Sequence, residues 1–269
     1  MKKEYYQEVE VYYDSDAEDF DKRYWENPVL QNIRQAFREE VKRFSFRNML
    51  EIGYGTGLDL VHFAKTHPGL ELDGIDISPG MQKIARARIK KEKLQNVVAE
   101  KGSVEDIQQL FPGKQFDMIC VFFGALNTVE DLQGAAKVLK SVSSPGGILV
   151  LSFVNKYYLV GMIMELIKCR FVAAFSRLKP EWGGYSPSKF LPSRCYRPGE
   201  IKKYFSDFKM VRRKGFSLLY PAWYYQRLYR LLGPLNPLLW KADRMLNKTP
   251  LWRFGEYSLF VFQNTDNMD

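Results

Sequence analysis

The chain contains 269 residues, a length within reach of one large α/β domain. Hydrophobic residues make up 46% of it and charged residues 26%, a balance that excludes a disordered or collagen-like chain. The three cysteines are scattered and form no C-x-x-C pair, and the histidines number two. This composition argues against a disulfide framework and against a metal site, and it favours a reducing compartment.

The formal net charge of +9 is unevenly distributed. Residues 1–156 carry 21 basic and 23 acidic side chains, whereas residues 157–253 carry 19 basic and 5 acidic ones. Residues 254–269 carry three acidic side chains and no basic one. One contiguous third of the chain, also rich in aromatic residues, thus holds the excess positive charge. Such a surface favours an acidic substrate, anionic lipid or nucleic acid, and the alternative is a solvated face that serves solubility alone.

No segment has the character of a membrane span or of a secretion signal. The most apolar stretch, residues 157–167, is interrupted by Glu165 and followed by Lys168 and Arg170. A helix needs roughly 20 apolar residues to cross a bilayer, and the N-terminal region is polar and acidic rather than a signal peptide. The sequence therefore predicts a cytoplasmic protein.

From the N-terminus, apolar residues first recur at helical spacing, at Val29, Ile33, Phe37 and Val41. Short apolar runs then alternate with helical stretches. Strands are predicted at 48–52, 71–77, 96–100, 116–123 and 148–153. Helices are predicted between them at 58–65, 79–93 and 131–142. This alternation predicts a parallel sheet with right-handed crossovers.

Beyond residue 155 the alternation ends. A basic amphipathic helix is predicted over 157–178, followed over 179–198 by a loop rich in proline and glycine. The remaining predicted elements are a helix at 198–205, a strand at 209–211, amphipathic stretches at 223–232 and 238–246, and a last strand at 256–262. Seven strands are thus expected in all.

The strongest local signal is a glycine-rich run, Glu51-Ile52-Gly53-Tyr54-Gly55-Thr56-Gly57, between the first strand and the following helix. Glycines there permit a tight turn with positive φ and let a ligand approach the backbone closely. The next strand ends in Asp76, 19 residues after Gly57. A carboxylate at that position can accept both hydroxyls of an adenosine ribose, and charge-assisted hydrogen bonds of this kind are worth about 1.5–3 kcal/mol.

With these residues the sequence resembles the class I S-adenosylmethionine-dependent methyltransferases, of the type that acts on small molecules. The resemblance covers about residues 46–155 motif by motif and residues 198–263 by topology only, and it implies that S-adenosylmethionine is the cofactor. It implies that the glycines curve under the methionine part, that Asp76 binds the ribose, and that Ile77 and Met81 line the adenine. The cofactor-binding residues expected from it are Glu51, Gly53, Tyr54, Gly55, Gly57, Asp76, Ile77, Met81, Ser103, Val104, Phe122, Phe123 and Tyr13.

Ser103 is a departure from the family pattern. Many members carry aspartate at this position, after the third strand, where the segment Gly102–Asp106 meets the adenine edge. A hydroxyl can still accept a hydrogen bond from the exocyclic amine, but the usual charge is missing. Cofactor affinity is therefore expected to depend more on Asp76.

The fold implied by the resemblance is α/β, with a Rossmann-like seven-stranded, mostly parallel sheet and helices on both faces. A mainly helical substrate cap is expected from two insertions, because the fifth strand ends, and the sixth and seventh strands are joined, at the cofactor edge. The expected divisions are an acidic, helical N-terminal lid at 1–45, a cofactor-binding core at 46–155, cap insertions at 156–197 and 215–254, and further core at 198–214 and 255–269.

The acceptor class follows by elimination. Residues 123–127, after the fourth strand, lack the Asn/Asp-Pro-Pro-aromatic stretch of nucleic-acid amino-methyltransferases, and no cysteine follows a proline. A small molecule with an apolar body and an acidic group is therefore expected under the cap. The cap residues suited to hold it are Phe171, Phe175, Arg177, Trp182, Tyr185, Arg194, Tyr196, Tyr220, Trp223, Tyr224, Tyr225 and Arg227.

No catalytic residue is assigned from the sequence. A general base would have to come from Tyr12, Tyr13 or Tyr24, with Asn127 as an orienting residue. Two other functions stay open: an RNA or DNA methyltransferase that binds its target through the basic cap, and a non-catalytic cofactor-binding module at a membrane surface. The predicted helix over 157–178 would suit anionic lipid, as basic amphipathic helices do.

Overall fold

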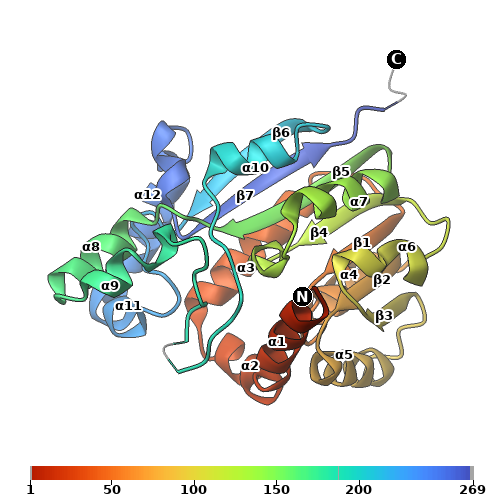
Figure 1. Ribbon diagram of the computed structural model, residues 1–269, viewed down its shortest axis with the longest axis horizontal. Helices are drawn as coiled ribbons and strands as arrows, with labels where there is room; N and C mark the ends of the chain where they lie inside the picture. The colour runs from red at the N-terminus through yellow and green to blue at the C-terminus, as the bar shows by residue number, and fades with distance from the viewer. Residues whose placement is uncertain (1, 187, 267–269) are drawn as a thin grey trace.

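A seven-stranded sheet organises the computed structural model, which describes residues 2–186 and 188–266 (Figure 1). The strand order is β3-β2-β1-β4-β5-β7-β6. The strands are β1 (Asn48–Ile52), β2 (Glu71–Asp76), β3 (Val97–Lys101), β4 (Phe116–Val121), β5 (Ser143–Val154), β6 (Lys209–Phe216) and β7 (Tyr257–Gln263). The pairs among β1 to β5 are parallel, and β7 is antiparallel to both of its neighbours. The expected mostly parallel, Rossmann-like sheet is confirmed.

Helices cover both faces of this sheet (Figure 1). The apolar residues of α3, α4 and α5 pack into one buried cluster, and those of α6, α7 and α10 into a second one. The helices are α1 (Lys2–Asp14), α2 (Ala17–Trp25), α3 (Pro28–Val41), α4 (Leu58–Thr66), α5 (Pro79–Lys91), α6 (Ile107–Leu110), α7 (Leu132–Val142), α8 (Leu159–Ile167), α9 (Phe171–Ala174), α10 (Pro198–Tyr204), α11 (Gln226–Leu232) and α12 (Asn236–Leu246).

One edge of the sheet collects the ends of the last three strands. Val154, at the end of β5, pairs with Tyr257, at the start of β7, and Tyr257 also pairs with Phe216, at the end of β6. The long connections that follow β5 and β6 therefore both leave from this edge. It is also the edge at which the parallel strands β1, β2 and β4 end, which is where ligands bind in open α/β sheets.

The prediction of a single basic helix over 157–178 is wrong. The chain forms α8, then α9, and then a short turn of 3-10 helix at Ser176–Leu178. Cys169 has a φ of +56°, a left-handed conformation that ends one helix and redirects the chain before the next. Residues 223–225 are irregular rather than helical, so the next helix, α11, begins at Gln226.

The strand expected at 209–211 is longer in the structure, because β6 continues to Phe216. Arg212 and Lys214 make this segment look like a solvated loop in the sequence. Both side chains instead pair with Glu40 of α3, at 3.0 Å for Arg212 Nε and 2.5 Å for Lys214 Nζ. The Glu40 carboxylate is fully buried, so these pairs attach the edge strand to the helix layer.

None of the helices in the described residues is long and apolar enough to span a bilayer.

Candidate functional site

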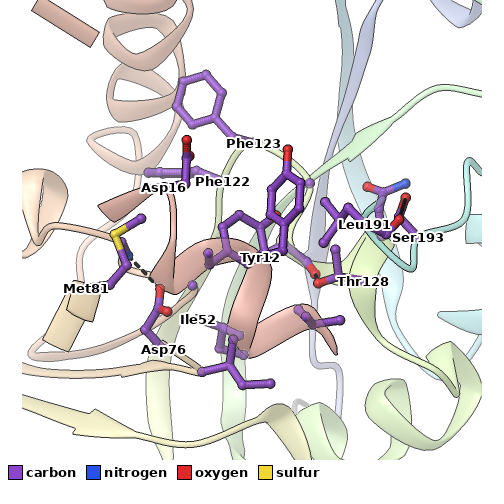
Figure 2. A pocket seen from close by; sticks show the side chains of 18 of the residues that line it. Tyr12, Asp16, Ile52, Asp76, Met81, Phe122, Phe123, Thr128, Leu191 and Ser193 are labelled. Carbon is purple, nitrogen blue, oxygen red and sulfur yellow. Dashed lines mark hydrogen bonds between the residues drawn. The ribbon is translucent and has the colours of Figure 1, made fainter. Parts of the chain in front are cut away.

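A pocket lies at the edge of the sheet where β1, β2 and β4 end (Figure 2). In Figure 2, Asp76 and Met81 lie at one end of it, and Leu191 and Ser193 lie at the other. Its walls come from the N-terminal helices, from the loops of the sheet and from the two long connections. Ten of the thirteen residues predicted to bind the cofactor line it: Tyr13, Gly53, Gly55, Asp76, Ile77, Met81, Ser103, Val104, Phe122 and Phe123.

The glycine-rich loop forms the floor of this end of the pocket. Gly53 and Gly55 have φ values of +71° and +57°, which disfavour any side chain. A Cβ on Gly53 would lie 2.6 Å from the Cβ of Ala125, whereas one on Gly55 would meet nothing nearer than the Phe20 ring at 3.5 Å. A side chain at Gly55 would therefore occupy the pocket rather than the protein interior.

Asp76 links the end of β2 to the glycine-rich loop. Its Oδ2 accepts a hydrogen bond from the backbone N–H of Gly55 at 2.8 Å, and its Oδ1 accepts one from the N–H of Ser78 at 3.0 Å. The side chain is buried, and desolvation raises the pKa of this carboxyl to about 6. Because a carboxylate oxygen has more than one lone pair, each oxygen can accept a further bond from a ligand in the pocket.

Beside Asp76 the pocket has an apolar lining. Ile77, Met81 and Val104 contribute to it, and Tyr13 of α1 covers it. The Ser103 hydroxyl donates a hydrogen bond to Asp106 Oδ2 at 2.7 Å. Its proton is thus engaged, and the hydroxyl is left to accept a bond, as a ligand with an amine group requires.

The structure does not bring Glu51, Tyr54 or Gly57 into the pocket. Glu51 lies buried behind the loop, where desolvation and the nearby Asp59 raise its pKa well above the usual range. The Tyr54 hydroxyl donates to the backbone oxygen of Glu100 at 3.0 Å. Gly57, with a φ of +77°, begins α4.

The comparisons with known proteins agree with this geometry. Residues 50–149 match a family described as "Methyltransferase domain". Residues 50–149 form a methyltransferase domain with the class I fold. It is 40% identical over 132 residues to demethylmenaquinone methyltransferase of Tropheryma whipplei, an alignment that covers 48% of this chain and 47% of the relative. The cofactor of this family is S-adenosylmethionine.

Other similarities extend over nearly the whole chain. An uncharacterized protein of Methanocaldococcus jannaschii is 29% identical over 264 residues, 96% of this chain and 92% of the relative. A chain in a complex between a Haloferax volcanii methyltransferase and its activator has the same fold, with a TM-score of 0.58 at 16% identity, covering 94% of this chain and 97% of that one. The elements outside the methyltransferase domain are therefore shared as well.

The N-terminal helices close one side of the methyltransferase pocket. Asp14, at the end of α1, accepts hydrogen bonds from the Gly80 N–H at 2.6 Å and from the Ser78 hydroxyl at 3.0 Å, at the start of α5. The Tyr6 hydroxyl donates to Glu105 Oε1 at 2.6 Å. Sequence reasoning missed several lining residues from this region, because nothing local marks which face of α1 and α2 turns inward. They are Tyr6, Val9, Asp16, Phe20, Arg23, Leu30 and Arg34.

The side chains considered as a general base or as an orienting residue differ in whether they are available to contact a ligand. Tyr12, Tyr13 and Tyr24 line the pocket, and burial raises the pKa of Tyr12 and of Tyr13. Asn127 has no free amide atom. Its Nδ2 donates to the backbone oxygens of Val154 at 3.1 Å and of Arg194 at 2.6 Å, and its Oδ1 accepts from the Val154 N–H at 2.9 Å. Asn127 thus holds the chain that leaves β5 in place.

Three of the aromatic cap residues, Trp182, Tyr185 and Trp223, line the far end of the pocket together with Tyr257. The Tyr185 hydroxyl lies 2.5 Å from Glu256 Oε1 and 3.2 Å from the Tyr257 hydroxyl. The other cap residues named from the sequence do not line it: Phe171, Phe175, Arg177, Arg194, Tyr196, Tyr220, Tyr224, Tyr225 and Arg227.

The positive charges of the pocket come from an unexpected part of the chain. The cap cation Arg177 is buried and pairs with Glu256 at 2.9 Å instead of lining the pocket. The lining cations are Arg23 of α2 and Arg34 of α3. Arg23 pairs with Asp16, and Arg34 pairs with the buried Asp59. Within the part of the chain that the structure describes, the Nε atom of Arg34 is buried without a hydrogen-bond partner.

Proposed function

We propose that this chain transfers the methyl group of S-adenosylmethionine to a small, lipophilic acceptor that carries an acidic group. The observation that carries the proposal is the continuity of a single pocket from the glycine-rich loop and Asp76 to the aromatic side chains Trp182, Tyr185 and Trp223. We also propose a peripheral contact with anionic membrane, through a surface separate from this pocket.

The cofactor end of the pocket suits S-adenosylmethionine in shape and in hydrogen bonding. Gly55 leaves its place open to the methionine part, and the free lone pairs of Asp76 suit the two ribose hydroxyls. The apolar residues Ile77, Met81 and Val104 suit the adenine ring. The bound cofactor supplies an activated sulfonium methyl group.

The acceptor end is apolar and aromatic. Trp182 and Tyr185 meet edge to face at a ring-centroid distance of 4.6 Å, and Tyr185 and Trp223 do so at 5.1 Å. Such rings contribute large apolar contact areas with restricted rotamers, which suits a flat or lipophilic molecule. Holding an acceptor in line with a methyl donor can supply about 7–11 kcal/mol of the barrier at best. Transfer of this kind needs orientation more than acid–base help.

A proton from a hydroxyl or amine acceptor could move along side chains of this end. Tyr185 lies close enough to Glu256 to donate its single hydroxyl proton to that carboxylate. Its oxygen is then an acceptor for the Tyr257 hydroxyl at 3.2 Å. Tyr257 lines the pocket, so its own oxygen is available to an acceptor group there. We assign Tyr257 as the orienting residue of the acceptor.

The first experiment is a turnover assay with purified protein, labelled S-adenosylmethionine and a panel of lipophilic acids, phenols and quinols, with RNA and DNA in parallel. Methylated product from a small acceptor supports the proposal. Methylation of nucleic acid, falling steeply with salt concentration, would replace it with the nucleic-acid alternative. Cofactor binding without turnover on any acceptor class would favour a non-catalytic module.

Replacing Tyr257 by phenylalanine is expected to lower kcat/KM for the acceptor by about 5- to 100-fold, the loss of one hydrogen bond in the pocket. The cofactor Kd should stay unchanged. Tyr158→Phe is the matched control, because the Tyr158 hydroxyl is buried without a hydrogen-bond partner among the described residues, and Tyr158 does not line the pocket. Equal losses in both variants would remove Tyr257 from the acceptor site.

Arg34→Gln tests the acidic part of the acceptor. Removing the Arg34 guanidinium group, which lines the pocket, is expected to weaken binding of the ligand whose anionic group contacts it by about 10- to 100-fold. A rise in acceptor KM alone supports an acidic acceptor, whereas a rise in cofactor Kd alone would assign Arg34 to the cofactor carboxylate. Arg38→Gln is the control, because Arg38 also pairs with Asp59, at 2.6 Å, but does not line the pocket.

A further inference from the structure

The helices α8, α9, α11 and α12 carry a group of exposed apolar side chains that the pocket does not use. Three of these side chains are largely exposed to solvent: Ile167 is 72% exposed, Val172 76% and Leu231 84%. The exposed apolar side chains of this surface, called here the cap surface, are Leu159, Ile163, Ile167, Phe171, Val172, Phe175, Leu231, Leu235, Leu238, Met245 and Leu251. A group of exposed apolar side chains on neighbouring helices indicates an interaction site.

The segments that carry these side chains lie together. Figure 1 places α8, α9 and α11 at one end of the molecule, away from the strands β1 to β4. The Tyr225 hydroxyl, just before α11, donates to Glu165 of α8 at 3.3 Å, and Lys168 Nζ lies 4.8 Å from the centre of the Tyr225 ring. The end of α8 therefore touches the start of α11.

The charges among these side chains are mostly positive. Residues 157–180 and 223–253 contain two acidic residues, of which Asp243 is buried and Glu165 is half-buried and paired with cations, and the exposed Glu181 follows the first of these segments. Asp243 accepts backbone N–H bonds from residues 218–220, and Glu165 bonds to Lys168 and Tyr225. The exposed cations of the same segments are Lys168, Arg170, Lys179, Arg227, Arg230, Lys241, Arg244, Lys248 and Arg253.

These cations are mostly free for an external partner. Lys168 and Arg170 lie near Glu165, at 2.7 Å and 3.8 Å, but the other seven form no ion pair within the residues that the structure describes. A second copy of this chain would present the same positive charges and be repelled. Nucleic acid would leave the aliphatic side chains exposed to water.

We infer that the cap surface docks onto an anionic lipid bilayer. Apolar side chains at a helix surface enter the boundary between headgroups and acyl chains, and the cations around them bind anionic headgroups. The side chains that meet the bilayer belong to the same insertions as Trp182 and Trp223 of the pocket. This proposal concerns a surface outside the pocket, so it stands or falls separately from methyl transfer.

Cys169 offers a direct probe of the contact. It is the one exposed cysteine of the three, and it lies between α8 and α9. An environment-sensitive fluorophore on Cys169 is expected to brighten and shift to the blue with vesicles of phosphatidylcholine and phosphatidylglycerol, and not with phosphatidylcholine alone. A Cys169→Ser/Val98→Cys variant moves the same probe to β3 as a control. A response from that site equal to the response from Cys169 would overturn the proposal.

Two variants test the two parts of the surface by vesicle sedimentation. Phe171→Glu/Val172→Glu removes apolar contacts, and Arg227→Glu/Arg230→Glu reverses two charges. Each is expected to weaken binding to the anionic vesicles by about tenfold or more. Val98→Glu is the control, because Val98 is also exposed, at 43%, but lies on β3.

Cofactor affinity, measured in solution, should be unchanged in all three variants, which shows that they are folded. If the protein sediments equally with and without phosphatidylglycerol, or if the control loses as much binding as the other two, the cap surface does not dock onto anionic lipid. If Phe171→Glu/Val172→Glu or Arg227→Glu/Arg230→Glu changes the oligomeric state without changing vesicle binding, the cap surface binds another copy of the chain instead.

Discussion

Replacing Gly55 by valine is expected to abolish measurable binding of S-adenosylmethionine while the protein remains folded. A Cβ at this position meets only the Phe20 ring, at 3.5 Å, so the added side chain fills the pocket instead of displacing the core. The φ of +57° adds strain of roughly 1–3 kcal/mol for a residue with a side chain. Calorimetric titration with the cofactor and with its demethylated product measures the loss.

The backbone strain needs its own control, and Gly113→Val supplies it. Gly113 has a φ of +71°, a Cβ there would meet nothing within 4 Å, and the residue does not line the pocket. The two variants should lose similar thermal stability, and only Gly55→Val should lose cofactor binding. Wild-type affinity in Gly55→Val would show that the cofactor does not pass over this loop.

Asp76→Ala is expected to weaken cofactor binding by about 10- to 100-fold, because charge-assisted hydrogen bonds to the ribose are worth about 1.5–3 kcal/mol. The same substitution frees the N–H groups of Gly55 and Ser78, to which the carboxylate is bonded in the structure. Asp76→Asn keeps one acceptor oxygen and should lose less. Unchanged affinity in Asp76→Ala would remove this residue from the site.

The pH dependence of cofactor affinity provides a second test of the role of Asp76. Its pKa is raised to about 6 by burial, so the carboxylate loses its charge as pH falls through about 6. Cofactor affinity should fall over the same range, and in Asp76→Asn this fall should disappear. The effect on folding has the opposite sign. Because the folded pKa lies above the unfolded value of about 3.9, ionised Asp76 lowers the free energy of unfolding as pH rises between these values.

Local patterns predicted the sheet well, and they predicted most of the residues from the glycine-rich loop and the strand ends that line the pocket. The strand expected at 48–52 is β1, Asn48–Ile52, because a mostly apolar run that ends at a glycine-rich turn is typical of a buried strand of a parallel sheet. Gly53 follows β1, Asp76 is the last residue of β2, and Met81 lies in the first turn of α5. Because parallel strands end at one edge of the sheet, these positions in the sequence were enough to predict that the three residues lie close together.

The aromatic end of the pocket and the inward faces of the N-terminal helices depend on contacts between distant residues, which no local pattern contains. Arg177 was expected to meet the acceptor, but its partner Glu256 lies 79 residues further along the chain and draws it away from the pocket. Arg34 lines the pocket because Asp59, 25 residues away, anchors its guanidinium group. The inward faces of α1 and α2 follow from contacts such as that of Asp14 with Gly80.

The position of β7 constrains the order in which the chain can assemble during synthesis. β7 pairs with β5 on one side and with β6 on the other, and β6 pairs with no other strand among the described residues. The strand made last is therefore inserted between two that were made earlier, and β6 has no neighbour until Tyr257–Gln263 has left the ribosome. Tyr257 then completes the pocket wall as well as the sheet. A ligand that contacts Tyr257 can thus stabilise only a chain in which Tyr257–Gln263 has been made, and a nascent chain lacking this strand leaves the facing edges of β5 and β6 unpaired.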